Sequence, residues 1–195
     1  ENQWNPLLNR SETNTIFLTY EWIVNWWKIF GKDKELLVLL AKNDENLVGI
    51  APLMIVNSKK FGIIDKKIQF IGAPLADYCD FIIAEDKESI LKLIYGYILE
   101  KKEKWDTMSL DEFPEQSSTI PLSKNILQNH TKNFDIFNSI SCLALDFRKS
   151  SEEELAKLLK KKDLQRHIKF FSNAGNFEIK KAEDLNEALS LLETF

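Results

Sequence analysis

The amino-acid sequence predicts a mixed α/β (α+β) domain, with a largely antiparallel sheet flanked by helices and a helical C-terminal extension. Three observations support this class. An aromatic helical pattern comes first, and two apolar segments joined by a short polar turn follow it. The later strand patterns then alternate with helical ones.

The composition excludes several classes of protein. Of 195 residues, 44% are hydrophobic, 29% are charged, and only six are Gly and five Pro, unlike collagen-like, low-complexity or disordered chains. No apolar run approaches the roughly 18 residues of a membrane span. A net charge of −4 argues against a dedicated nucleic-acid binder. Cys79 and Cys142 match no metal or redox spacing, so we expect a reduced chain in the cytoplasm without a metal.

The N-terminal elements have clear signatures. Residues 19–30 carry aromatic and aliphatic side chains at helical spacing, with Thr19 as a suitable N-cap and Gly31 at the end. The apolar run 36–42 predicts a strand buried on both faces. A four-residue polar turn should join this run to a partner strand at 47–57.

The remaining elements follow from the same patterns. Further strands are predicted at residues 66–71, 78–84, 105–110, 138–147 and 177–180. Further helices are predicted at residues 89–104, 123–133, 155–174 and from 183 onward. The acidic residues that follow Ser150 are typical of a helix N-terminus.

The composition shift near residue 150 predicts two domains, residues 1–148 and 149–195. The chain stops within an apolar helical pattern, so we expect a piece of a longer protein with an incomplete second domain. The apolar stripe of that last helix could mediate self-association.

No familiar catalytic motif is present. The glycines are scattered rather than gathered in a phosphate-binding loop, and no Cys/His cluster is suited to zinc. His130 and His167 lie in predicted helices without a neighbouring Ser, Cys or second His, and we interpret them as surface side chains. The catalytic residues therefore stay unassigned.

The most informative segment is Gly-Ala-Pro-Leu-Ala-Asp-Tyr-Cys-Asp, residues 72–80. Gly and Pro between two predicted strands indicate an irregular crossing. Asp77, Tyr78 and Asp80 there could bind a substrate hydroxyl or amine, or accept its proton. The alternative is that Asp77 caps a turn and Tyr78 packs against the fold.

Two other features admit a structural and a functional interpretation. The aromatic helix is better explained as core than as a platform for stacking a ligand. Lys162, Arg166 and Lys169 share one helical face, which is either a solvated surface or an anion- or phosphate-binding site. On the structural interpretation, Arg166 would be the surface salt-bridge partner of Asp77.

Several segments resemble the GNAT-like acetyltransferases that include bacterial cellulose-biosynthesis acetyltransferases. They are TYEWIVNWWKIFG, LLVLLAKNDENLVGIAPLMI, KIQFIGAPLADYCDFIIA, WDTMSLDEFPEQS and KKKDLQRHIKFFSNAGNFEI. The stretch GAPLADY is similar to the G-P-x-x-D-Y turn of the FemAB aminoacyl transferases, which are built from two GNAT-like halves. The resemblance covers nearly the whole chain. It implies that residues 1–148 form the first half and that residues 149–195 begin the second.

One departure from this family concerns the cofactor. A working GNAT half carries a glycine-containing loop between its central strand and the next helix, where backbone N–H groups hold the CoA pyrophosphate. Residues 83–89 have no glycine and three acids there, so the first half resembles a degenerate GNAT domain. The resemblance implies that acetyl-CoA or another acyl-CoA binds in the full-length protein and not to this fragment.

The resemblance implies an acyltransferase acting on a cell-envelope or polysaccharide-related acceptor, with this chain as the substrate-side half. The expected partner is a small-molecule or glycan-type acceptor. The alternative is a non-catalytic binding or interaction module, because a GNAT fold without its glycine loop can persist as a scaffold.

Overall fold

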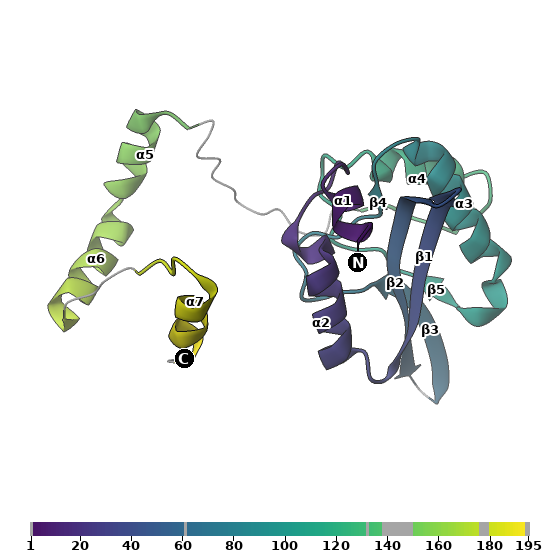
Figure 1. The fold of residues 1–195 in the computed structure, drawn as a ribbon, viewed down its shortest axis with the longest axis horizontal. Coiled ribbons are helices and arrows are strands. Elements are labelled where there is room, and N and C mark those ends of the chain that lie inside the picture. The colour runs from purple at the N-terminus through teal and green to yellow at the C-terminus, as the bar shows by residue number, and fades with distance from the viewer. Residues whose placement is uncertain (1, 61, 132, 138–149, 176–179, 194–195) are drawn as a thin grey trace. The chain divides into compact units, whose positions relative to one another are not determined.

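The computed structural model describes residues 2–60, 62–131, 133–137, 150–175 and 180–193. The chain divides into two compact units, Glu1–Phe137 and Asn138–Phe195 (Figure 1). The predicted domain boundary at residue 148 lies outside the described residues, as do the predicted strand 138–147 and most of the predicted strand 177–180. The first unit contains the whole described sheet.

The sheet is mixed and mostly antiparallel, as the sequence predicts. Its strands are β1 (Lys34–Asn43), β2 (Asn46–Lys60), β3 (Ile63–Phe70), β4 (Ile82–Ile83) and β5 (Thr107–Met108). The order is β1-β2-β3-β5, with β4 paired to the first part of β2. Among the described pairs only β3 and β5 run parallel.

The predicted hairpin is confirmed, and both of its strands are longer than expected. Asn43 pairs with Asn46 across the turn, and Asp44 adopts a positive φ of 52° there. The prediction that residues 36–42 are buried on both faces is wrong. The strand β1 lies at the edge of the sheet, so its apolar side chains are only half-buried or exposed.

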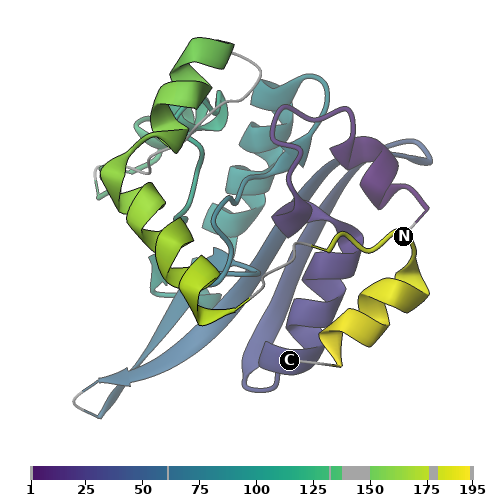
Figure 2. The same ribbon diagram turned by 90° about the vertical axis from the view of Figure 1, so that its left-hand side faces the viewer.

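The long strand β2 separates two hydrophobic cores, because its side chains alternate between the two faces. On one face Ile50 and Met54 pack with helices α1 (Trp4–Leu8) and α2 (Tyr20–Phe30). On the other face Ala51, Leu53 and Ile55 join a core that includes residues of helices α3 (Lys87–Glu100) and α4 (Thr119–Leu127). Figures 1 and 2 show the sheet between α2 on one side and α3 on the other.

Helix α2 forms where the sequence predicts it. The Thr19 hydroxyl accepts a hydrogen bond from Trp22 N at 3.3 Å, which satisfies a backbone group at the helix start. At the helix end a Cβ on Gly31 would lie 2.5 Å from the carbonyl oxygen of Trp27, so only glycine fits. Ile23 and Trp26 of this helix are buried in the hydrophobic core, which supports the interpretation of the aromatic pattern as core.

The other predicted elements of this unit are present with different bounds. The predicted strand 78–84 is reduced to β4, because Cys79 N donates to Glu112 O and Asp80 is held by side chains instead of a strand. The predicted helix 89–104 ends at Glu100 and continues as a 3-10 helix, η2 (Lys102–Lys104). The predicted helix 123–133 begins and ends earlier, as α4, and accepts Pro121 in its first turn.

The second unit is helical where it is described. It contains α5 (Glu152–Leu159), α6 (Lys162–Ala174) and α7 (Leu185–Leu192). The expected helix start is confirmed, since Ser151 and Glu154 form a reciprocal capping box. The expected single helix 155–174 is wrong, because it breaks at Lys160–Lys161, where the Gln165 amide donates to Leu159 O at 2.7 Å. In the described part of the chain, no helix has the length and apolar content needed to cross a membrane.

Candidate functional site

The predicted crossing, residues 72–80, lies between two strands that both pair with β2. Strand β3 pairs with β2 from Leu53 onward and β4 pairs at Gly49 and Ile50, so both use the same edge of β2. Pro52 lies between these pairings, and its carbonyl accepts from Ile71 N at 2.9 Å. Since proline has no N–H to donate, it suits this gap between the two pairings, where β2 lacks a strand partner on this edge.

A tight turn begins the crossing. Gly72 has a φ of +109°, and its carbonyl accepts from Leu75 N at 2.7 Å and Ala76 N at 3.0 Å. A Cβ on Gly72 would lie 3.1 Å from the Ala76 Cβ and 3.6 Å from Trp22 Nε1. The turn therefore lies directly against helix α2, with Leu75 projecting outward at 54% exposure.

Asp77 and Tyr78 follow the turn on the surface. Both side chains are exposed, and the Tyr78 ring lies 6.5 Å from Phe17, which belongs to the 3-10 helix η1 (Ile16–Leu18). Phe17 in turn meets Trp22 edge-on at 5.0 Å. The structure thus places an aromatic group beside Tyr78, one of the predicted site residues. Sequence analysis did not find Phe17, because it is distant in sequence and lies in no recognisable pattern.

Asp80, the third predicted residue, is fully buried. Its carboxylate accepts hydrogen bonds of 2.6 Å from the hydroxyls of Thr13, Ser117 and Thr119, and one of 2.8 Å from Phe81 N. Four donors around one carboxylate offset much of the cost of its burial. Asp80 therefore anchors the crossing from inside the protein. It does not face the solvent beside Asp77 and Tyr78.

A second charged cluster adjoins the Asp80 cluster. Lys87 Nζ lies 2.7 Å from Glu12, and Ser118 donates both its hydroxyl and its backbone N–H to the same carboxylate. Burial by itself would raise the pKa of the Glu12 carboxyl. Hydrogen bonds from Lys87 and Ser118 outweigh burial and lower that pKa below its ordinary value of 4.5. Glu12 thus connects the N-terminal segment to the starts of α3 and α4.

Some buried side-chain atoms in the first unit lack a hydrogen-bond partner. Among the described residues, these side-chain atoms are Thr15 Oγ1, Trp22 Nε1 and Trp26 Nε1. Since buried donors are normally paired, Trp22 Nε1 beside Gly72 is an unused hydrogen-bond donor under the crossing.

The connection between β4 and α3 is acidic. Glu85 and Asp86 are exposed there, and Glu88 is exposed in the first turn of α3; Asp86 has a positive φ of 46° and does not cap the helix through its side chain. Glu85 lies 3.7 Å from Arg10 and Glu88 lies 2.6 Å from Lys92, both on the surface. Three carboxylates at this connection repel rather than attract a phosphate.

The predicted anion site lies in the second unit. Lys162, Arg166 and Lys169 are exposed on α6, and their spacing of four and three residues puts them on one face. Arg166 pairs with Asp163 on its own helix at 3.4 Å, so the ion pair that the structure gives it is local.

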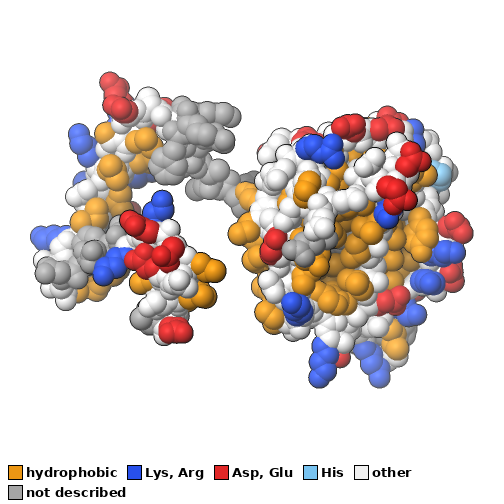
Figure 3. Space-filling model, in the orientation of Figure 1, with side chains coloured by type: hydrophobic (Ala, Val, Ile, Leu, Met, Phe, Trp, Pro, Cys, Tyr) orange, Lys and Arg blue, Asp and Glu red, His pale blue; other side chains and the backbone are white. Residues whose placement is uncertain are grey.

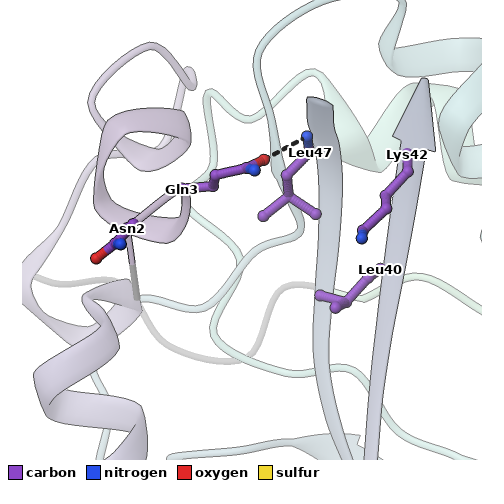
Figure 4. Close-up of a pocket in the computed structure, with 5 residues that line it drawn as sticks. All are labelled: Asn2, Gln3, Leu40, Lys42 and Leu47. Carbon is purple, nitrogen blue, oxygen red and sulfur yellow. Dashed lines mark hydrogen bonds between the residues drawn. The ribbon is translucent and has the colours of Figure 1, made fainter. Parts of the chain in front are cut away.

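A depression in the first unit lies elsewhere. It has a volume of about 530 Å³ and is lined by the N-terminal residues Asn2 and Gln3 and by Leu40, Lys42 and Leu47 at the hairpin end of the sheet (Figure 4). The Gln3 amide is already engaged, because it accepts from Leu47 N at 2.7 Å and donates to Glu45 O. The depression is open and does not include the crossing.

The histidines give no support to a catalytic or metal site. His130 lies in the turn that follows α4 rather than within a helix, and His167 is exposed on α6. Within the described ranges, no group of three or more His, Cys, Asp or Glu side chains is arranged to hold a metal ion.

Comparison with known proteins adds no family. No family model matches this chain, and a search of curated proteins finds no match either.

Proposed function

We propose that this chain is the acceptor-binding part of an acyltransferase of the GNAT-like type, acting on a cell-envelope or polysaccharide-related acceptor. The observation that carries the proposal is the crossing. Asp77 and Tyr78 stand exposed where β3 and β4 separate along β2, on a turn fixed by Gly72. Irregular backbone at a break in strand pairing is a common place for a ligand.

The residues of the crossing suit an acceptor nucleophile. In acyl transfer, an acceptor hydroxyl or amine attacks the thioester carbonyl, loses a proton and releases the thiol of the donor. The Asp77 carboxylate can orient such a group and accept its proton. Tyr78 offers a phenol and a ring face beside Phe17 for the body of the acceptor. Asp80 would serve as a positioning residue through the backbone of the crossing.

The acyl-CoA donor is assigned to the full-length protein rather than to this unit. The carboxylates of Glu85, Asp86 and Glu88 at the β4–α3 connection oppose a bound pyrophosphate. The exposed cations Lys162, Arg166 and Lys169 on α6 are of the right sign for a phosphate group of the donor or the acceptor. We therefore expect no acyl-CoA binding by residues 1–137.

Two variants test the acceptor site in the full-length enzyme. We expect Asp77→Asn and Tyr78→Phe each to lower kcat/KM for the acceptor at least about tenfold while the melting temperature stays constant. Glu115→Gln, at another exposed acid of this unit, is the matched control. Unchanged turnover with a lowered melting temperature would reduce the segment to a structural role.

Calorimetry with acetyl-CoA tests the placement of the donor. We expect heat of binding with the full-length protein and none with this chain. Tight binding by the chain would contradict our interpretation of residues 83–89. If the full-length protein binds no acyl-CoA, the alternative of a non-catalytic binding module, which the acidic connection also favours, replaces the enzyme.

A further inference from the structure

The strand β1 is an unprotected edge of the sheet. Within the described sheet it pairs with β2 alone. The direction of its backbone groups follows from Pro52, whose carbonyl points to Ile71 on the opposite side of β2. In an antiparallel pair, two opposite residues either bond each other or both point away. Val38, opposite Pro52, therefore directs its N–H and C=O to the free edge, as do Leu36 and Leu40, two residues away on either side.

The side chains of this edge are apolar on both faces. The six residues from 36 to 41 carry no charge, and Leu36 and Leu40 are each 53% exposed. Natural edge strands are usually protected by an inward charge, a proline or a bulge within the strand. Here Glu35 and Lys42 lie outside the apolar run, and the register shift at Ala41/Lys42 lies at its end. Figure 3 shows hydrophobic side chains gathered over β1 and β2.

We propose that β1 pairs with β1 of a second copy of this chain, antiparallel and about a two-fold axis. Such pairing satisfies the outward N–H and C=O groups of both copies with one another. It also places the uncharged residues 37–41 of the two copies opposite one another, so the centre of the contact is apolar. The result is one mixed sheet that is continuous through both copies, with antiparallel pairing at the contact.

Charge selects the register. With the axis at Val38, Lys34 of one copy would lie opposite Lys42 of the other. With the axis at Leu39, Lys34 instead lies past the end of the partner's β1, and Val38 lies opposite Leu40. Since like charges directly opposite destabilise a sheet, we favour the axis at Leu39.

Sedimentation equilibrium from micromolar to near-millimolar concentration tests the proposal. We expect a dimer that Leu40→Lys weakens at least about tenfold in dissociation constant. Val38→Pro should act likewise, because it removes an outward N–H and leaves the bonds between β1 and β2 in place. Circular dichroism establishes that both variants remain folded.

Two controls separate this surface from others. Leu93→Lys on α3 and Leu189→Lys on α7 replace leucines that are 67% and 52% exposed, and both should leave the dimer intact. A monomer at every concentration overturns the proposal. So does a dimer that Leu189→Lys dissociates and Leu40→Lys does not, since self-association would then run through α7.

The register has its own test. In a Cys79→Ser, Cys142→Ser background, Leu39→Cys should form an intermolecular disulfide under mild oxidation, because the two copies of this residue meet at the axis in a non-hydrogen-bonded pair. Efficient cross-linking through Val38→Cys instead would place the axis at Val38 and overturn the register.

Discussion

The hydroxyl of Thr13 donates a hydrogen bond of 2.6 Å to the carboxylate of Asp80, 67 residues further along the chain. Ser117 and Thr119 donate to the same carboxylate from the start of α4. One buried charge thus connects the N-terminal segment, the crossing and a helix of the opposite layer. The position of Asp77 and Tyr78 depends on this connection, since they lie three and two residues before Asp80.

Replacing Asp80 by Asn should destabilise the first unit by about 2–4 kcal/mol. The amide presents an NH₂ group where a carboxylate oxygen accepts from hydroxyls, so those hydroxyls must turn to accept or lose their hydrogen bonds. Urea unfolding measures the change. Asp77→Asn, an exposed change of the same kind, should stay within about 0.5 kcal/mol. Equal stability of the two variants would show that the buried carboxylate is not the connector.

Two glycine substitutions should have opposite effects on the free energy of unfolding. Gly72→Ala places a Cβ at a φ of +109° and 3.1 Å from Ala76, and should cost about 1–3 kcal/mol. Gly96→Ala adds a methyl group within α3 where no atom lies within 4 Å, and should stabilise by up to about 1 kcal/mol. Thermal unfolding of both variants checks the pair. A stabilising Gly72→Ala would mean that the turn tolerates a different backbone.

Glu12 should make stability depend on acid pH. Because its folded pKa is lowered below 4.5, its contribution is present above that value and is lost as pH falls through the folded pKa. The carboxylate is partly exposed, so the effect should not exceed about 1 kcal/mol. Between pH 5 and about pH 3, the melting temperature of Glu12→Gln should therefore fall less than that of the wild-type protein. Glu115→Gln should follow wild type.

Cys79 should resist alkylation in the folded protein. Burial, reinforced by Glu112, Asp80 and Asp111, raises the pKa of its thiol to about 12, and the side chain is 1% exposed. At pH 8 the folded Cys142→Ser variant should react with iodoacetamide roughly a thousandfold more slowly than the same variant unfolded in urea. Fast reaction in the absence of urea would mean that residues 72–80 open readily.

The sequence predicts best where structure is local. Helix α2 has its cap, its periodic aromatic residues and its terminal glycine within a dozen consecutive positions, and the hairpin has its turn between two apolar runs. Side-chain periodicity and turn chemistry act over such short distances. The helix start at Ser151 is predicted for the same reason.

Where partners are distant, the sequence misleads. The run 36–41 resembles a central strand, and only the strand order shows that it is an edge. Residues 78–81 have strand-like composition, but their hydrogen bonds go to Glu112, Thr13, Ser117 and Thr119. The composition of a segment does not indicate which remote segment will supply its hydrogen-bond partners.

Local patterns are enough to predict the mixed sheet, its first helix and its hairpin, and they single out the segment that contains Asp77, Tyr78 and Asp80. Which of these three side chains is buried depends on the folded chain. Asp80 is buried because three hydroxyls from remote segments donate to its carboxylate. Asp77 and Tyr78 are exposed after the turn at Gly72, where the Tyr78 ring lies near Phe17. A carboxylate is buried only where enough donors assemble around it, and that assembly exists only in the folded chain.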